Sequence, residues 1–286
     1  MKRLFCAFAA SVLLMGLTGP AQAQYTFTTI DVPGANYTRA SAINGFNEIV
    51  GWYEGDGFRD HGFLLDADGS YTTVDVFGSS QTRADGINDS GQIVGEYVEA
   101  ISALSHGYLR EVDRSYTPLN FPGAYQTFPR AINDIGQVVG TYTDASFCCH
   151  GFLRDVDGAY TTLDAPGATD TYVFGINIVG QVVGTFSDIH GDHGFLLDVD
   201  GSYTTLQFPR ARLTYPSGIN SAGQIVGTYE GEVGMHGFLL DVNGSYTTID
   251  VLGGYDTEAV GINDAGQIVG SYSDGKSPHG FLATPN

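Results

Sequence analysis

An Ile-Asn pair recurs six times in this sequence, and the residue five positions before each asparagine changes from repeat to repeat. The asparagines are Asn44, Asn88, Asn133, Asn177, Asn220 and Asn263. The changing residues are Arg39, Arg83, Phe128, Tyr172, Tyr215 and Glu258. Arginine donates paired hydrogen bonds to carboxylates, and aromatic rings offer flat apolar faces to sugars. The row therefore predicts a binding site for a sugar acid or another planar anion.

A second variable row lies two residues further on. Its members are Ser41, Asp85, Arg130, Phe174, Ser217 and Val260. We add Arg130 from this row to the predicted ligand-binding residues. By contrast, the residue just before the first row is threonine in every repeat, as at Thr38 and Thr82, which indicates a structural role.

Histidine and aspartate also recur in the repeats, and for both we favour a structural role. Each His-Gly-Phe or His-Gly-Tyr tripeptide begins with a histidine, namely His61, His106, His150, His193, His236 and His279. A residue placed once per repeat is expected to order the repeat by hydrogen bonding to loop backbone. Aspartate pairs such as Asp66 and Asp68 resemble calcium loops but lack the further oxygen ligands that Ca²⁺ needs. We expect them to cap turns, and we predict no metal site and no cofactor.

Two other groups carry reactive side chains. His190 lies in "SDIHGDHG" near Asp188 and Asp192, where weak metal binding or acid–base chemistry is conceivable, although a solvated loop histidine is favoured. Cys148 and Cys149 are adjacent, so they either form a strained vicinal disulfide or remain two thiols. The sequence contains no GxSxG, HExxH or phosphate-binding glycine loop. We therefore assign no catalytic residue.

The first 23 residues have the pattern of a secretory signal peptide. Lys2 and Arg3 precede an apolar stretch, and "AQA" supplies small residues before Gln24. Removing this segment leaves ten basic residues against 32 acidic ones, a net charge of −22. So acidic a surface repels phosphate backbones and anionic lipids. We expect a secreted monomer, extracellular or periplasmic, that binds neither nucleic acid nor membranes.

The rest of the chain, 24–286, is predicted to be a single all-β domain of repeated units. Successive Ile-Asn asparagines lie 43 to 45 residues apart, a period typical of propeller blades. Each unit contains four short strand patterns: the stretch ending in Ile-Asn, then "QIVGxY", "HGFLL" and "SYTTxD". Asn-Asp-x-Gly and Asp-x-Asp-Gly are tight-turn signals between them, and Asn47 replaces the glycine of the first.

The ends of the chain predict a closed ring. A lone strand of the fourth type stands at 25–31, and a lone strand of the third type stands at 279–282. Pairing these two strands would complete the last blade and remove the exposed edges of an open array. The sequence therefore predicts a six-bladed β-propeller of four-stranded blades, closed by strand 25–31 against strand 279–282. A differently packed β array is the alternative.

The length variation points to one face of such a disc. All of it falls between the aromatic residue after Val-Gly and the next histidine, as between Tyr53 and His61. Insertions collect where backbone is exposed and unpaired. We therefore expect the function on the face that carries these loops.

The combination of "GINDxGQIVG" with "HGFL" resembles the HAF-type extracellular repeat family, over essentially all of 25–282. That family is named for a His-Ala-Phe tripeptide, which here is His-Gly-Phe five times and His-Gly-Tyr once. The resemblance implies a secreted bacterial repeat protein and brings no catalytic motif to this chain.

Two functions remain open on the sequence alone. The favoured one is a secreted, non-catalytic binding propeller that recognises a carbohydrate or protein through its variable loop face. The alternative is a polysaccharide lyase or hydrolase that acts on an anionic glycan at the channel mouth, with Tyr172, Tyr215, Glu258 or His190 as acid or base. The fold cannot choose between them. An enzyme requires two titratable groups that converge on one pocket.

Overall fold

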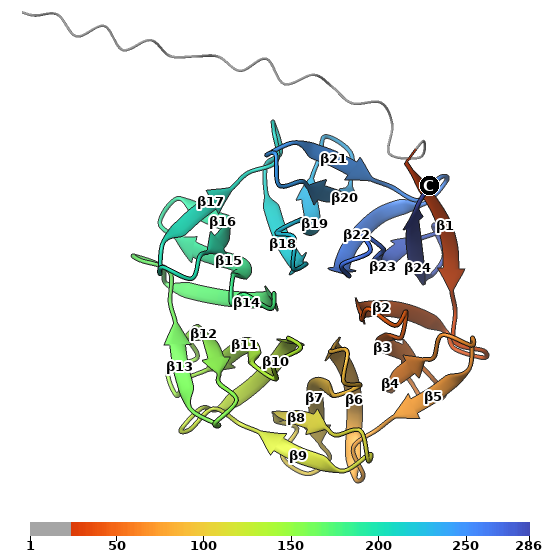
Figure 1. Cartoon of the computed structure of the whole chain (residues 1–286). Coiled ribbons are helices and arrows are strands. Elements are labelled where there is room, and N and C mark those ends of the chain that lie inside the picture. Colours follow the sequence, from red (N-terminus) through yellow and green to blue (C-terminus); the bar gives the residue numbers. More distant parts are fainter. Residues whose placement is uncertain (1–23) are drawn as a thin grey trace, which may run out of the picture.

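The computed structural model describes residues 24–286, which form six four-stranded antiparallel sheets arranged in a ring (Figure 1). The predicted six-bladed β-propeller is therefore confirmed. The predicted signal peptide, 1–23, lies outside the described residues. Within the described part of the chain every regular element is a strand, and it contains no helix that is long and apolar enough to cross a membrane.

Four strand positions, A to D from the axis outward, recur in every blade. The A strands are β2 (Tyr37–Ile43), β6 (Ser79–Ile87), β10 (Gln126–Ile132), β14 (Asp170–Ile176), β18 (Thr214–Ile219) and β22 (Tyr255–Ile262). The B strands are β3 (Ile49–Glu54), β7 (Ile93–Glu99), β11 (Val138–Thr143), β15 (Val182–Asp188), β19 (Ile225–Glu230) and β23 (Ile268–Ser273). The C strands are β4 (Asp60–Leu65), β8 (Ser105–Arg110), β12 (Cys149–Arg154), β16 (Gly191–Leu197), β20 (Met235–Leu240) and β24 (Pro278–Pro285). The D strands are β1 (Tyr25–Ile30), β5 (Tyr71–Val74), β9 (Tyr116–Leu119), β13 (Tyr160–Leu163), β17 (Tyr203–Leu206) and β21 (Tyr246–Ile249).

The ring closes through β1, as predicted. This strand pairs antiparallel with β24, from Tyr25 opposite Pro285 to Ile30 opposite Gly280, and it completes the sheet of β22 and β23. Strand β1 and the C-terminus lie side by side at that blade (Figure 1). The predicted strand 279–282 lies within β24, which extends to Pro285, and β1 pairs with its residues 280–285.

The hydrophobic core lies between neighbouring blades. The aromatic residue of each His-Gly-Phe or His-Gly-Tyr is buried to 1% exposure or less, as at Phe63 and Tyr108. Around Tyr108, side chains from two blades meet, with Val50 and Val74 from the first blade and Ile93 from the second. Near the axis the blades approach closely, since a Cβ on Gly86 would lie 2.9 Å from the Ala131 Cα. The residue two positions before each recurring asparagine is glycine or alanine, and its small size lets neighbouring blades approach this closely.

A ring of asparagine side chains joins the six A strands around the axis. Each recurring asparagine donates from Nδ2 to the backbone carbonyl of the equivalent asparagine in the next blade, at 3.1–3.2 Å. The last of these bonds runs from Asn263 to Asn44 and closes the circle. Asn47, which takes the glycine position of the first tight turn, has φ 65°, so the predicted left-handed backbone is confirmed.

Replacing one member of this ring should destabilise the whole propeller. Asn177→Ala removes the buried bond to Asn220 O and the acceptor of the part-buried Gln181 backbone N–H. We expect a loss of about 2–4 kcal/mol in the free energy of unfolding, measured by urea denaturation. Asn243→Ala is the control, because Asn243 accepts hydrogen bonds only from Ser245 in an exposed turn, and its replacement should cost less than about 1 kcal/mol. Equal losses in the two variants would contradict a special role for the ring.

Candidate functional site at the channel mouth

Every A strand contains a β-bulge at the same place. The pairing with strand B shifts by one residue between, for example, Ala40 and Ala42, or Ala84 and Gly86. A bulge redirects the extra side chain, and bulges are common beside functional sites. All six bulged residues line one cavity of about 300 Å³ in the central channel: Ser41, Asp85, Arg130, Phe174, Ser217 and Val260. The second variable row of the sequence thus forms a ring inside the channel.

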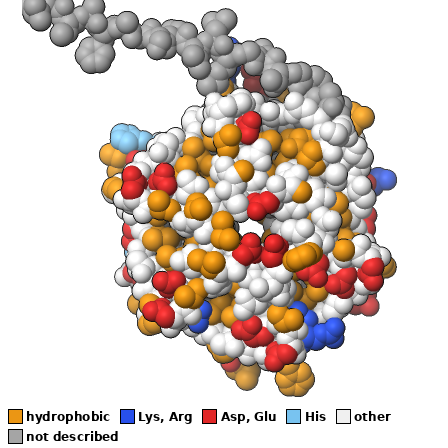
Figure 2. All heavy atoms as spheres, in the orientation of Figure 1, with side chains coloured by type: hydrophobic (Ala, Val, Ile, Leu, Met, Phe, Trp, Pro, Cys, Tyr) orange, Lys and Arg blue, Asp and Glu red, His pale blue; other side chains and the backbone are white. Residues whose placement is uncertain are grey.

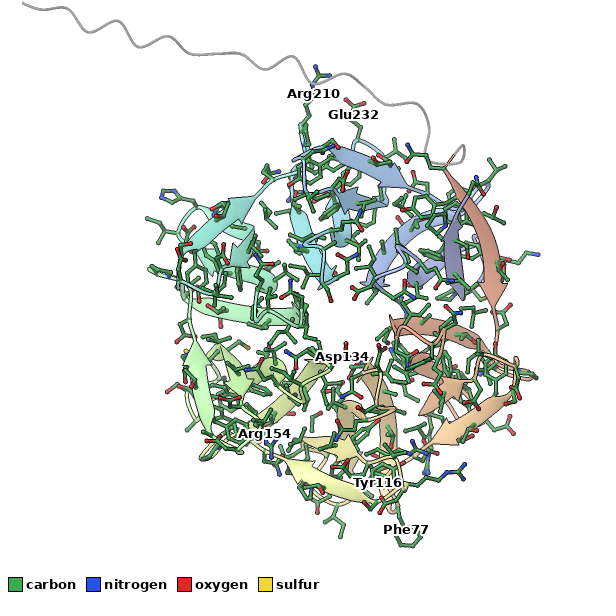
Figure 3. All side chains as sticks on the ribbon, in the orientation of Figure 1. Phe77, Tyr116, Asp134, Arg154, Arg210 and Glu232 are labelled. Carbon is green, nitrogen blue, oxygen red and sulfur yellow. The ribbon has the colours of Figure 1, made fainter. Side chains whose placement is uncertain are left out.

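A belt of isoleucines separates this cavity from the other end of the channel. The residue before each recurring asparagine belongs to the belt and borders both spaces, as do Ile43 and Ile176. The space beyond holds about 120 Å³ and is lined by the asparagine ring together with Asp89, Asp134 and Asp264. Figure 2 shows acidic side chains around this opening, and Asp134 lies beside it in Figure 3. The larger cavity, at the variable-loop end, is the candidate site, and we call it the channel mouth.

The structure brings four of the seven predicted site residues to the channel mouth. Arg39, Arg130 and Glu258 line the cavity. Arg39 Nη1 lies 2.8 Å from Glu258 Oε2, although the two residues are 219 positions apart in the chain. Arg83 lies against Trp52, which lines the cavity, with its guanidinium carbon 4.1 Å from the ring centre.

The other three predicted residues do not line this cavity. Phe128 lies under Arg130, whose guanidinium carbon is 5.7 Å from the ring centre. A hydrogen bond with Cys149 and burial raise the pKa of the Tyr172 phenol. Burial and the nearby Asp192 carboxylate raise the pKa of Tyr215. Both tyrosines are therefore set among groups of the variable loops rather than in the channel.

Three arginines form ion pairs that cross from one blade to the preceding one. Arg39 on β2 reaches Glu258 on β22, and Arg130 Nη1 on β10 lies 3.4 Å from Asp85 Oδ1 on β6. Arg83 on β6 donates from Nε to Asp60 Oδ2 on β4 at 2.8 Å. Arg83 Nη1 also lies 3.6 Å from Glu96 Oε1 in its own blade. Every guanidinium group that was predicted to bind an anion is thus already paired with a carboxylate.

The sequence analysis missed several residues of the site. Asp85 and Phe174 stand in the second variable row, and Trp52, Asp60 and Glu96 were not considered. The sequence could have indicated two of these residues, because Trp52 and Glu96 both stand directly after a Val-Gly pair. That position holds threonine or serine in four repeats but Trp52 and Glu96 in the first two. The two repeats that lack threonine or serine at this position are therefore the first two, whose blades contribute several of the charged residues of the site.

Asp85 is the most perturbed carboxylate at the channel mouth. Its side chain is 10% exposed, and Oδ2 is buried without a hydrogen-bond partner. Burial raises the pKa of Asp85 to about 6; Arg130 acts against this shift and Glu96 adds to it. Glu96 has the same arrangement, with a side chain 10% exposed and Oε2 unpartnered. Two buried carboxylates therefore share two arginines in this part of the site.

The recurring histidines are structural, as expected, but their partner is different from the one predicted. His61 Nδ1 lies 2.7 Å from Asp75 Oδ2 at the end of the neighbouring D strand, and its ring lies beside Tyr53. The same hydrogen bond joins His150 to Asp164, and in the closing blade it joins His279 to Asp31. A loop carbonyl is a partner at His236, where Nε2 lies 2.9 Å from Val233 O.

The turn aspartates and the recurring threonines have the structural roles predicted for them. Asp68 Oδ1 accepts a hydrogen bond from the Ser70 backbone N–H at 2.9 Å, which is an Asx-type turn. Thr38 is buried, and its hydroxyl accepts from the Val32 backbone N–H at 3.0 Å. Equivalent bonds occur in the other blades, so neither residue type is available for chemistry.

The remaining reactive residues lie away from the channel mouth. His190 is exposed, and its backbone N–H donates to Asp188 Oδ1. Cys148 and Cys149 are free thiols rather than a disulfide. Over residues 24–286, no three histidine, cysteine, aspartate or glutamate side chains come together as metal ligands would.

Comparison with known proteins supports the fold alone. The sequence matches no protein-family model and no curated protein sequence. Among solved structures, it is similar to a putative TolB from Agrobacterium tumefaciens, with TM-score 0.60, 14% identity, and 87% of this chain and 90% of that one covered. A gluconolactonase from Xanthomonas campestris gives TM-score 0.57 at 11% identity, covering 94% of each chain. A mutant of the Aleuria aurantia lectin in complex with Fucα1-6GlcNAc gives TM-score 0.54 at 11% identity, with 91% and 96% covered. Propellers similar to this one thus include both binding proteins and enzymes.

The raised pKa of Asp85 should appear in the pH dependence of stability. An acid with a higher pKa in the folded protein binds more protons when folded, so its contribution to stability falls as pH rises between its two pKa values. For Asp85 these pKa values are the ordinary 3.8 in the unfolded chain and about 6 in the folded protein. Removing the carboxyl group in Asp85→Asn abolishes this penalty. We expect the free energy of unfolding of Asp85→Asn, relative to wild type, to increase by about 1–3 kcal/mol from pH 4 to pH 6.

The control variant is Asp68→Asn. Hydrogen bonds from Ser70 lower the pKa of Asp68, so this exposed carboxylate contributes stability that is lost as pH falls. The stability of Asp68→Asn relative to wild type should therefore fall as pH rises, but only below about pH 4, so it should stay nearly flat from pH 4 to pH 6. Urea denaturation at a series of pH values measures both differences. A difference for Asp85→Asn that stays flat from pH 4 to pH 6 would show that Asp85 ionises normally.

Proposed function

We propose that this protein is a non-catalytic binding propeller that takes a carbohydrate into the channel mouth. The observation that carries the proposal is the mixed lining of the cavity. Charged side chains, those of Arg39, Glu258, Asp85 and Arg130, line it together with the apolar side chains of Phe174 and Val260. A sugar likewise has hydroxyl groups at its edges and apolar C–H faces. Pockets for small ligands combine an apolar wall with a few convergent polar groups in this way.

The dimensions and the fold also support a carbohydrate. A cavity of about 300 Å³ is at the lower end of the range for small-ligand sites and suits the terminal residue of a glycan. A lectin in complex with Fucα1-6GlcNAc has the same general architecture, at a level of identity that carries no residue across. Export is part of the proposal, on the basis of the signal-like segment 1–23 and the resemblance to HAF-type repeats.

An enzyme acting on a glycan is the second candidate, and one observation favours it. Asp85 and Glu258 are two carboxylates that line one cavity, and the pKa of Asp85 is raised to about 6. A raised pKa suits a general acid. The other groups considered for acid–base chemistry, Tyr172, Tyr215 and His190, are not in the cavity lining. Chromatography of glycans incubated with the protein would reveal new reducing or unsaturated ends if this candidate is correct.

A single tryptophan makes the binding proposal directly testable. Trp52 is the one tryptophan of the sequence, and it lines the channel mouth. Titration with glycans chosen from an array screen should change its fluorescence. Phe174→Ala removes the apolar face of the site and should weaken binding by about tenfold, equivalent to about 1.4 kcal/mol.

Phe77→Ala is the matched control for that change. Phe77 is fully exposed and points outward from the rim of the disc in Figure 3. Its replacement should leave the affinity unchanged within twofold. If Phe174→Ala binds as tightly as wild type, the sugar does not occupy the channel mouth.

A further inference from the structure

The charges at the channel mouth do not balance. The mouth cluster, as we define it, contains three guanidinium groups and four carboxylates: Arg39, Arg83, Arg130, Asp60, Asp85, Glu96 and Glu258. With every group ionised, its net charge is −1. Three of its four carboxylates are shielded from water, since the side chains of Asp60, Asp85 and Glu96 are exposed by 10% or less. A shielded excess charge interacts strongly with whatever enters the cavity.

No guanidinium group is free to receive an anion. Arg39 and Arg130 are the basic residues among the described residues that line the cavity, and they are paired with Glu258 and Asp85. Arg83 is held by Asp60 and Glu96 and covers Trp52. A carboxylate ligand would have to displace one of these partners and leave it unpaired next to another negative charge.

Unused acceptors are present instead. Asp85 Oδ2 and Glu96 Oε2 have no hydrogen-bond partner, and the carboxylate of Glu258 accepts from Arg39 through Oε2. An unpartnered carboxylate oxygen favours a positively charged donor. Burial raises the pKa of Asp85, Arg130 acts against this shift, and the neighbouring Glu96 carboxylate adds to it.

The rest of the channel has the same sign of charge. Asp89, Asp134 and Asp264 line its other end, and acidic residues exceed basic ones by 20 in the whole sequence. A channel with acidic lining and low-dielectric walls concentrates cations. Among residues 24–286 no group of side chains is arranged to hold a metal ion, so an organic cation is the appropriate class.

We infer that the sugar bound at the channel mouth carries a protonated amine, as an amino sugar does, and that Asp85 and Glu258 on the cavity wall select it. The inference rests on the proposed carbohydrate-binding function and names the charge of the ligand. An ammonium group has three donors, and its single positive charge brings the mouth cluster to zero. The predicted sign is opposite to the anionic glycan that the arginines alone suggest in the sequence.

Three trisaccharides with the same β-1,4 backbone provide the test. They are the trimers of glucosamine, N-acetylglucosamine and glucose, which differ at C2 by an ammonium, an acetamide and a hydroxyl group. The monosaccharides glucosamine, glucose and glucuronic acid are compared in the same way, and glucuronic acid is the anionic probe. Trp52 fluorescence at pH 6.5 and low salt gives the affinities. We expect the glucosamine trimer to bind at least tenfold more tightly than the glucose trimer, and glucuronic acid to bind more weakly than glucose.

Variants that remove one negative charge should abolish this preference. Asp85→Asn and Glu258→Gln each bring the mouth cluster to zero, so the ratio of glucosamine-trimer to glucose-trimer affinity should fall at least fivefold. Glu258→Gln keeps the test valid if Asp85→Asn does not fold. Asp68→Asn removes the same charge from an exposed turn and should leave the ratio unchanged.

The outcomes separate the two proposals. Equal affinities for the glucosamine and glucose trimers, or tighter binding of glucuronic acid, would overturn the amine inference and leave carbohydrate binding intact. An unchanged affinity ratio in both mouth variants would also overturn it, because the preference would then arise elsewhere. If no sugar changes the fluorescence of Trp52 and calorimetry detects no binding, the proposed function itself fails.

Discussion

The hydrogen bonds that close the asparagine ring fix the geometry on which the rest of the structure depends. A propeller has no central core, because its apolar side chains pack between blades rather than at the axis. Buried Nδ2 groups therefore join each A strand to the next, and the bond from Asn263 to Asn44 makes the chain of contacts circular. The same asparagine accepts from the backbone of its own tight turn, as Asn177 does from Gln181. One residue type thus sets both the turn and the spacing of the blades.

The regular scaffold contrasts with an irregular channel mouth. In blades three to five, the position after Val-Gly is a buried threonine, which satisfies its hydroxyl without introducing charge. In the first two blades it is Trp52 and Glu96, and Arg83 of the second blade contacts both. Glu96 and Asp85 each leave one oxygen unpartnered, which costs about 1–3 kcal/mol for each group. Stability is therefore lost on the side of the ring where the ligand-binding groups are concentrated.

Much of the fold could be predicted from the sequence because its determinants are local and repeated. The nearly equal spacing of six asparagines predicted the six blades, and the lone strand patterns at 25–31 and 279–282 predicted the closing blade. The replacement of a turn glycine by Asn47 corresponds to a backbone φ of 65°. The contents of the site were harder to predict. Strand alternation alone places positions five and three before each asparagine on the same side. The bulge falls at the position three before the asparagine, so all six residues of that row line the channel, whereas only Arg39 and Glu258 of the row five before it do.

The sign of the charge at the site could not be predicted either, because it depends on partners that are distant in the chain. Arg39 and Arg83 appear in the sequence as free cations on a variable face. Their partners are Glu258, which becomes a neighbour only when the ring closes, and Asp60, which begins the C strand β4 of the adjacent blade. An arginine paired with a carboxylate still offers oriented hydrogen-bond donors to a ligand, but the pair has no net charge and attracts an anion only weakly. The excess carboxylate of the mouth cluster therefore determines the selectivity, and an acidic channel with an organised arginine frame favours a ligand that brings its own positive charge.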